Sequence, residues 1–277
     1  MHLNDLLAPF GVRLVRNGTL ARLQALEAKL HEQAIDGRPT AVPIASEPAR
    51  LLLNAVALNQ LDVGPALGAI FKDISVAGQL VAASEAAVWL HQHADKAPAF
   101  ARRSALLESI VPQIPPDGDL AEFGVFDGAI TRFMRPRFPN RRYHAFDSFR
   151  GVPEAMSLAV HQYSFDLDGK IPDLPPNTTI HAGWFEDTIP MWRERFGGSI
   201  AWAYIDCDLY ESVCTVLEGL SDRIKPGTIL SYDDWYNFPN WKQHSYRATQ
   251  EWTKRTGIKL RPLAFTTLEQ SVSFVVE

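Results

Sequence analysis

The sequence predicts an α/β protein whose second half is a doubly wound, mostly parallel sheet. From residue 121 onward, short apolar runs alternate with helical stretches, which is the pattern of strands joined by crossover helices. The run over residues 200–205 is apolar on both faces, as in a strand buried between two helical layers. The last two runs, 260–265 and 272–276, are joined by a turn too short for a parallel crossover. We therefore expect the chain to end in an antiparallel hairpin.

The elements of this second half follow from apolar runs and from residues that stop them. Glycine and proline at 225–227 end one helix, and Gly257 ends another. The proline-rich stretch 153–176 has no period and is expected to be a long loop. Before the final hairpin, the expected strands are 121–126, 142–146, 178–182, 200–205 and 228–232, and the expected helices are 127–135, 189–196, 213–224 and 245–256.

The first 110 residues are expected to be helical, without strands. Leucines recur at helical spacing over residues 20–30, and Ser46 before Pro48 is typical of a helix start. Further helices are expected over 80–93 and 98–110. A stretch rich in proline and glycine, 112–118, then separates a helical N-terminal region (1–111) from the sheet-containing domain (112–277).

Composition limits the classes of protein. The chain has 277 residues, 46% hydrophobic and 21% charged, which is enough for a sizeable core and excludes wholesale disorder. A net charge of −5 argues against binding to nucleic acid through phosphate neutralisation. Two cysteines argue against a disulfide scaffold, and there is no apolar run of bilayer length and no signal-peptide pattern at the start. We expect a cytoplasmic protein without a membrane span.

The first strand of the sheet ends in a turn that contains glycine. Gly124 and Gly128 would let the backbone approach a ligand, and the next helix offers free N–H groups at its start. Asp147 ends the second strand, 19 residues after Gly128, where an acidic side chain can accept the hydroxyls of a ribose. The full dinucleotide pattern of three glycines is missing. The alternatives are a plain strand-to-helix turn and a turn-forming Asp147 before Ser148.

The strongest signal is a set of carboxylates after the fourth and fifth strands. Asp206 and Asp208 follow one strand, and Asp233 and Asp234 follow the next. If these strands are neighbours, about 4.8 Å apart, the four side chains converge at one edge of the sheet. Carboxylates that close repel one another, and a divalent cation such as Mg²⁺ would resolve the repulsion. The alternative is that Asp208 caps a helix and the other pair makes a turn.

Two further side chains are weaker candidates. His244 follows an aromatic stretch, 235–241, and is a candidate catalytic base or substrate contact, although a packing role is the commoner one for such a residue. The aromatic stretch is expected either to wall a sugar or ring substrate or to belong to the core. Cys207, between two aspartates, is expected to be a packing residue.

Five motifs in order carry a resemblance to a known family. They are EFGVFDG (122–128), AFDSFRGVPE (145–154), GWFEDTIP (183–190), IDCDLYES (205–212) and the pair KPGT (225–228) with YDDW (232–235). Together they resemble the macrocin O-methyltransferase family, which consists of class I, Rossmann-like, S-adenosylmethionine-dependent sugar methyltransferases. The resemblance covers about residues 118–277.

The resemblance implies a methyl donor, a metal and roles for single residues. It implies S-adenosylmethionine as cofactor, Mg²⁺ as the usual metal, and a sugar or glycosylated small molecule as acceptor. It makes Asp208 the general base; His244 stays a second catalytic candidate on the position described above and not on the resemblance. The expected metal ligands are Asp206, Asp233 and Asp234. The expected cofactor contacts are Glu122, Gly124 and Gly128 at the methionine part, Asp147 and Ser148 at the ribose, Gly183, Trp184 and Phe185 at the adenine, and Asp206.

The leading hypothesis is therefore a Mg²⁺-assisted O-methyltransferase, with rivals from other classes. One rival is a metal-independent methyltransferase for small molecules. Another is a non-catalytic cofactor-binding or assembly protein. A nicotinamide-dependent oxidoreductase would need a tighter glycine pattern and a further substrate domain, and the sequence has neither. The N-terminal helices are expected to form a lid, a homodimer interface, or both.

Overall fold

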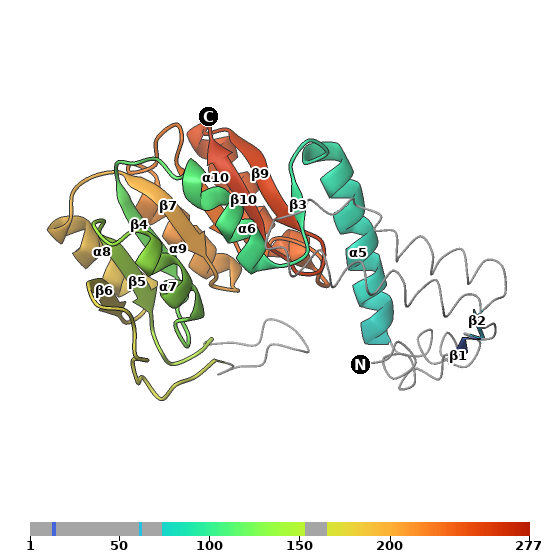
Figure 1. The fold of residues 1–277 in the computed structure, drawn as a ribbon, viewed down its shortest axis with the longest axis horizontal. Helices are drawn as coiled ribbons and strands as arrows, with labels where there is room; N and C mark the ends of the chain where they lie inside the picture. The colour runs from blue at the N-terminus through green and yellow to red at the C-terminus, as the bar shows by residue number, and fades with distance from the viewer. Residues whose placement is uncertain (1–12, 15–60, 63–73, 153–164) are drawn as a thin grey trace.

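The computed structural model describes residues 13–14, 61–62, 74–152 and 165–277, and its centre is an eight-stranded sheet (Figure 1). The strand order is β3-β9-β10-β8-β7-β4-β5-β6. The strands are β3 (Ala99–Phe100), β4 (Asp119–Phe123), β5 (Tyr143–Asp147), β6 (Thr178–Ala182), β7 (Ile200–Ile205), β8 (Ile229–Tyr232), β9 (Leu260–Thr266) and β10 (Val272–Val276). A separate antiparallel pair is formed by β1 (Arg13–Leu14) and β2 (Leu61–Asp62).

The helices alternate with the strands as expected. They are α5 (Ile74–His93), α6 (Arg103–Ile110), α7 (Ala129–Met134), α8 (Phe185–Arg195), α9 (Tyr210–Leu220) and α10 (Ser245–Thr256). Short 3₁₀ turns occupy Val111–Gln113, Arg135–Arg137 and Trp241–Gln243. Helix α10 ends at Gly257, whose φ of 75° allows the left-handed turn that stops a helix. No helix within these described ranges is long and apolar enough to cross a membrane.

The predicted sheet topology is confirmed. Strands β4 to β8 are parallel to their neighbours in the order β8-β7-β4-β5-β6. Strand β10 lies between β8 and β9 and is antiparallel to both, so the expected C-terminal hairpin is present. Strands β6, β7 and β10 have the bounds that the sequence predicts.

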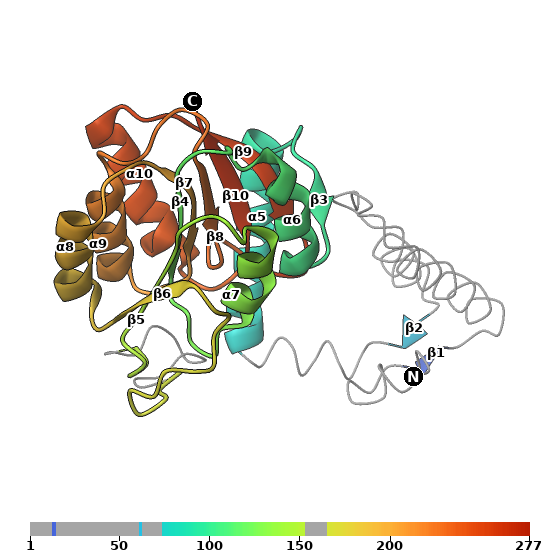
Figure 2. The ribbon, with the colours of Figure 1, turned by 60° about the vertical axis from the view of Figure 1, so that its left-hand side comes forward.

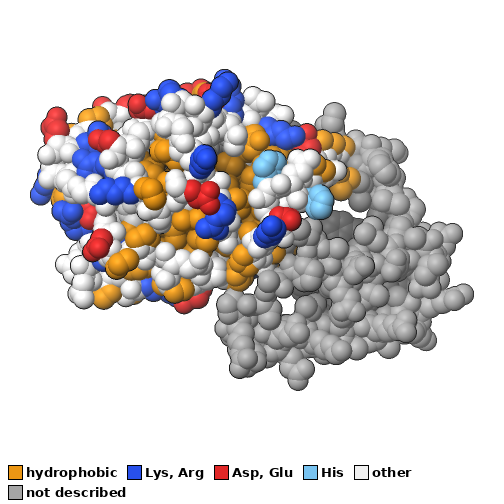
Figure 3. All heavy atoms as spheres, turned by 90° about the horizontal axis from the view of Figure 1, so that it is seen from above, with side chains coloured by type: hydrophobic (Ala, Val, Ile, Leu, Met, Phe, Trp, Pro, Cys, Tyr) orange, Lys and Arg blue, Asp and Glu red, His pale blue; other side chains and the backbone are white. Residues whose placement is uncertain are grey.

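Helices cover both faces of the sheet, and each face has its own apolar core (Figure 2). On one face, side chains of α8, α9 and α10 pack on β7, β8 and β10. On the other face, side chains of α6 and α7 pack on β4, β5 and β7. Every residue of β4 and of β7 is buried, because these strands lie in the middle of both layers. On the face shown in Figure 3, charged side chains of both signs are interspersed, with hydrophobic side chains between them.

The structure corrects the expectation that the N-terminal region has no strands, because β1 pairs with β2 and β3 joins the sheet. The helix expected over residues 98–110 begins only at Arg103, and the residues before it form β3, which pairs in parallel with β9. The cause is backbone hydrogen bonding to β9, since Phe265 N–H donates to the Pro98 carbonyl at 3.1 Å. A two-residue strand is too short to have a readable period.

Three helices begin earlier than expected: α5 at Ile74, α8 at Phe185 and α9 at Tyr210. Helix α9 also ends earlier, at Leu220 and not at residue 224. The helices expected over residues 20–30 and from Ser46 lie outside the described residues. The domain boundary at residues 111 and 112 stays a prediction. Strand β3 and helix α6, which precede that boundary, are part of the sheet and of its cover.

The register of the central strands brings four chain segments to one edge of the sheet. Phe123 pairs with Phe146 and with Ile205, and Ile205 pairs with Tyr232. The residues that follow these strand ends therefore leave the sheet at one level. They are Gly124, Asp206 and Asp233, together with Asp147 at the end of β5.

Gly124 is required by the close approach of two of these segments. Its φ is 91°, and a Cβ built on it would lie 1.7 Å from the carbonyl oxygen of Asp206. We predict that Gly124→Ala lowers the free energy of unfolding by about 3 kcal/mol or more, because the left-handed backbone and the clash add. Urea denaturation followed by circular dichroism measures this. Gly197→Ala is the control, because a Cβ there meets nothing within 4 Å. Equal stability of the two variants would contradict the prediction.

Candidate functional site

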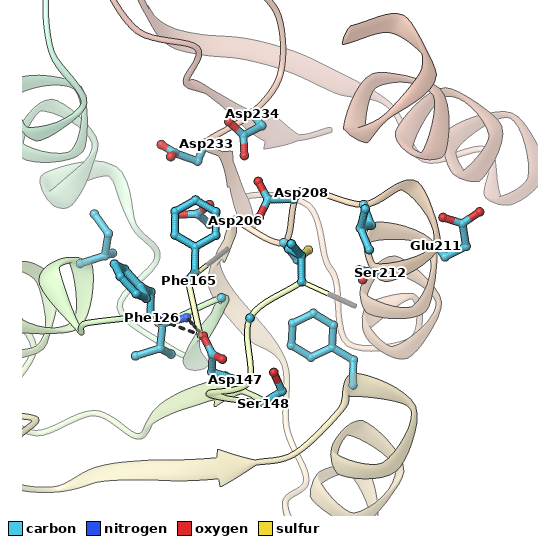
Figure 4. Close-up of a pocket in the computed structure, with 18 of the residues that line it drawn as sticks. Phe126, Asp147, Ser148, Phe165, Asp206, Asp208, Glu211, Ser212, Asp233 and Asp234 are labelled. Atoms are coloured by element: carbon cyan, nitrogen blue, oxygen red, sulfur yellow. Dashed lines mark hydrogen bonds between the residues drawn. The ribbon is translucent and has the colours of Figure 1, made fainter. Parts of the chain in front are cut away.

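A cavity of about 580 Å³ opens at the edge of the sheet where β4, β5, β7 and β8 end (Figure 4). The loops after these strands and after β6 supply most of its wall, and Gln79 of α5, Arg103 of α6 and Gln270 of the β9–β10 turn also line it. Such a volume is typical of a site for a small molecule or cofactor. The predicted site residues on this wall are Gly124, Asp147, Ser148, Gly183, Trp184, Phe185, Asp206, Asp208, Asp233 and Asp234.

Three aspartates form a carboxylate cluster at one end of the cavity. Asp206, Asp208 and Asp234 each offer an oxygen, and these oxygens lie within 4.8 Å of one another. The cluster exists because β7 and β8 are neighbours, as the sequence predicts. Asp208 has a φ of 56°, an unusual backbone conformation that aspartate tolerates better than most residues. Figure 4 shows the three side chains turned toward a common space.

The three carboxyl groups of the cluster have raised pKa values. Burial, followed by the charges of the neighbouring aspartates, raises the pKa of Asp206 and of Asp234 well above the ordinary value. Burial also raises the pKa of Asp208, and a hydrogen bond from Asp234 opposes this rise. Crowded, buried carboxylates disfavour their charged forms, and a nearby positive charge would relieve this. A divalent cation would supply that charge, so the donor set fits a hard ion such as Mg²⁺.

Asp233, the third predicted metal ligand, makes different contacts. Its Oδ2 accepts a hydrogen bond from Arg103 Nη1 at 2.6 Å, and its Oδ1 accepts one from Tyr204 Oη at 2.7 Å and one from Ser271 Oγ at 2.9 Å. Arg103 Nη1 also lies 3.8 Å from Asp206 Oδ2. The structure therefore places Asp208 in the cluster where the sequence analysis placed Asp233.

Asp147 organises the loop after β4. Its Oδ2 accepts hydrogen bonds from the N–H groups of Val125 and Phe126, both at 2.7 Å, and its Oδ1 accepts one from Phe149 N–H at 2.6 Å. A carboxylate has about four acceptor positions, so one remains for a ligand. Asp147 is predicted to accept both hydroxyls of a ribose, but backbone N–H groups already occupy three of its acceptor positions.

Glu122 lies behind the cavity wall and not on it. Its side chain is fully buried, and its Oε2 accepts hydrogen bonds from Tyr143 Oη at 2.5 Å and Thr131 Oγ1 at 2.7 Å. Burial raises the pKa of Glu122 to about 7. A direct contact with a ligand in the cavity, as the resemblance implies, is not available in this arrangement.

Gly128 and His244 are also absent from the cavity wall. Gly128 makes the left-handed turn before α7, with a φ of 86°. His244 is half-buried against Phe238, and this burial lowers the pKa of its imidazole. The charge of Glu211 and a hydrogen bond to the backbone of Asp208 act in the opposite direction and raise that pKa. The catalytic role of His244 stays a prediction.

Three residues on the cavity wall have no signal in the sequence. Arg103 reaches the aspartates from the start of α6, in a region expected to be only a lid or an interface. Phe126 and Phe165 pack edge to face, with ring centroids 5.3 Å apart, and both remain more than 40% exposed beside the cavity. Neither the arginine nor the aromatic pair belongs to a recognisable spacing. Cys207, expected to be a packing residue, packs on the core and also lines the cavity.

Comparisons with known proteins find methyltransferases that are similar to part of this chain. A family described as "Methyltransferase domain" matches residues 121–235. The "8-demethyl-8-(2,3-dimethoxy-alpha-L-rhamnosyl)-tetracenomycin-C 4'-O-methyltransferase" of Streptomyces olivaceus is 30% identical over 141 residues, which is 43% of this chain and 53% of that protein. The chain therefore spans about half the length of this curated relative.

Two solved structures are similar over a larger part of the chain. The O-methyltransferase NovP is 21% identical, with a TM-score of 0.49 over 62% of this chain and 76% of that one. The calicheamicin methyltransferase CalS11 is 22% identical, with a TM-score of 0.45 over 62% of this chain and 76% of that one.

The chain has a doubly wound α/β fold, and its residues 121–235 match a methyltransferase domain. The strand order, with β10 antiparallel between β8 and β9, is the predicted class I arrangement. The matched residues 121–235 contain all four strand ends and the carboxylate cluster. The resemblance to sugar O-methyltransferases that the five motifs indicated is likewise confirmed by the curated relative.

The raised pKa of Asp234 predicts how stability changes with pH. A carboxyl whose pKa is raised by folding favours the folded state below the ordinary value of 3.8, and this contribution is lost as pH rises through the raised pKa. Asn is neutral throughout, so Asp234→Asn should increase the free energy of unfolding by about 1 kcal/mol at pH 8 without divalent cations, and by nothing at pH 4.

Urea titrations at the two pH values measure this difference. Asp95→Asn, at an exposed position, is the matched control and should change stability at neither pH. A variant at position 234 that is less stable than the wild type at pH 8 would show that the carboxylate is needed for folding.

Proposed function

We propose that this chain transfers a methyl group from S-adenosylmethionine to a hydroxyl of a sugar or of a glycosylated small molecule, with the assistance of Mg²⁺. The observation that carries the proposal is the carboxylate cluster of Asp206, Asp208 and Asp234 at one end of a cavity that continues over the ends of β4 and β5. The cavity is large enough for a nucleoside beside an acceptor. The printed activity of the tetracenomycin relative, a 4'-O-methyltransferase, favours a sugar hydroxyl.

Asp147 and Ser148, two of the proposed cofactor contacts, lie on a part of the wall away from Asp208 and Asp234 (Figure 4). Asp147 has one free acceptor position for a ribose hydroxyl, and Ser148 lies beside it. Gly183, Trp184 and Phe185 would bound the adenine, and the Trp184 side chain is 39% exposed and so available for stacking. When bound, S-adenosylmethionine supplies an electrophilic methyl group on its sulfonium.

Asp206 and Asp234 are the proposed metal ligands, with Asp208 next to them. The cluster fits a cation because its three carboxyl groups are crowded and have raised pKa values. When bound, Mg²⁺ supplies the positive charge that lowers the pKa of a hydroxyl. Asp206 directly follows β7 and lies on the cavity wall, so it is also a proposed contact to the cofactor.

Asp208 is the proposed general base. Its left-handed backbone turns the carboxylate into the cavity, and it accepts the hydrogen bond from Asp234 in the metal-free state. When ionised, Asp208 is free to take the proton that the acceptor hydroxyl loses as its oxygen is methylated. The other residues of the wall position the two reactants, which supplies much of the rate enhancement.

A metal-independent methyltransferase is the second candidate, and one observation favours it. Arg103 already places a positive charge 2.6 Å from Asp233 and 3.8 Å from Asp206, so part of the acidic charge is neutralised by the chain itself. A cytoplasmic location and a dimer through the N-terminal region remain proposals.

A direct assay separates these candidates. Purified protein is incubated with S-adenosylmethionine and a pool of nucleotide sugars or glycosylated small molecules, with Mg²⁺ or with a chelator. The proposal expects a product heavier by one methylene group that forms only with the metal. Equal product with the chelator would favour the metal-independent enzyme. Binding of S-adenosylmethionine by calorimetry without any product from a broad acceptor pool would favour a non-catalytic role.

Asp208→Asn tests the proposed base. Asn tolerates the left-handed backbone and keeps the shape of the side chain, but it cannot take a proton. We predict that kcat falls by about 100-fold or more, while the dissociation constant for S-adenosylmethionine changes less than about threefold. Glu211→Gln, a second carboxylate on the cavity wall, is the control and should lose less than about tenfold. Nearly full kcat for the Asp208 variant would exclude its role as base.

A further inference from the structure

The acidic end of the cavity is divided by an arginine from outside the matched domain. Four aspartates follow β7 and β8, but only Asp206, Asp208 and Asp234 share a common space. Asp233 is tied to Arg103, which lies at the start of α6, before residue 121. Arg103 is the only residue of the described part of the chain that forms ion pairs with these aspartates.

Asp233 has little capacity left for a cation. Both of its oxygens are engaged: Oδ2 by Arg103, and Oδ1 by Tyr204 and Ser271. Tyr204 is buried and Arg103 Nη1 lies 3.3 Å from its Oη, so all the partners belong to one network. The bond between Arg103 and Asp233 is charge-assisted and short, at 2.6 Å. A metal ion would have to break this network to gain Asp233 as a ligand.

The backbone holds Arg103 in place. The N–H of Arg103 donates to the carboxylate of Glu269, in the β9–β10 turn. Just before it, the Phe100 carbonyl accepts a hydrogen bond from Thr267 N–H at 2.8 Å, and β3 pairs with β9. The backbone of Arg103 is therefore anchored, and its guanidinium is held beside Asp233 by the hydrogen bond described above.

This arrangement limits how many protein oxygens a cation can find. Mg²⁺ is commonly bound by one or two carboxylates and several waters in octahedral geometry, whereas Ca²⁺ takes six to eight oxygens. With Asp233 held by Arg103, the cluster offers three carboxylates. The guanidinium, 3.8 Å from Asp206, also repels a second positive charge.

We propose that Arg103 is a specificity-determining residue of the cation site: it withholds Asp233 and so tunes the site to bind Mg²⁺ weakly and in preference to Ca²⁺. The inference rests on the proposed function, since it requires that the cluster binds a divalent cation. It assigns Asp233 to Arg103 and not to the metal.

Calorimetric titration of the full chain with MgCl₂ and with CaCl₂ tests this directly, without acceptor or methyl donor. Arg103→Gln removes the charge and frees Asp233, so both ions should bind more tightly, with Ca²⁺ gaining about tenfold and Mg²⁺ less. Arg102→Gln is the matched control: it is the neighbouring arginine, 68% exposed, and its ion pair is with Glu269 alone. Its affinities for both ions should equal those of the wild type.

A double variant, Arg103→Gln with Asp233→Asn, separates the two roles of Asp233. If Asp233 serves only Arg103, removal of both charges leaves Mg²⁺ affinity within about threefold of the wild type, whereas Asp234→Asn weakens it more than about tenfold. The Gln–Asn pair can still form hydrogen bonds, so this variant remains informative if Arg103→Gln alone does not fold.

The outcomes are distinguishable. Loss of Mg²⁺ binding in the double variant, to the level of Asp234→Asn, would make Asp233 a metal ligand and overturn the inference alone. Unchanged Ca²⁺ and Mg²⁺ affinities in Arg103→Gln would also overturn it while the metal site stands. A wild type that binds neither ion would remove the inference together with the metal in the proposed function.

Discussion

The site depends on the mutual repulsion of carboxylates that the parallel register forces together. Because β7 and β8 end at the same level, their four following aspartates must share one edge of the sheet. The chain relieves part of the repulsion with a guanidinium held against Asp233, and the pKa of Asp208 remains raised by burial. The chemistry available to the cavity follows from what neutralises the remaining carboxylates.

The sequence was sufficient for the strands from β4 to β10 and for the meeting of the aspartates, but not for β3. Apolar runs fixed the bounds of β6, β7 and β10, and the short link between the last two strands fixed their antiparallel pairing. Once β7 and β8 were taken as neighbours, the convergence of their following residues required no side-chain information.

The details of the site were beyond the sequence, because they depend on contacts over long separations. The pairing of Arg103 with Asp233 spans 130 residues and depends on β3, which is too short to show a period. Asp147 was taken as a free ribose acceptor because a pattern cannot show that three backbone N–H groups already occupy it. Glu122 looks like a residue available to a ligand, because the sequence does not show that its carboxylate is buried and hydrogen-bonded to Tyr143 and Thr131.

The pairing of β3 with β9 also has a consequence for association. Without β3, strand β9 would be the edge strand of the sheet, and the unpaired backbone groups of an edge strand can pair with strands of other molecules. Strand β3 covers its end at Phe265 and Thr266, and Pro262, which has no N–H to donate, interrupts the remainder. Growth of the sheet from one molecule into the next is thereby discouraged on this side, and β6 is left as the strand with an unpaired edge at the other end of the sheet.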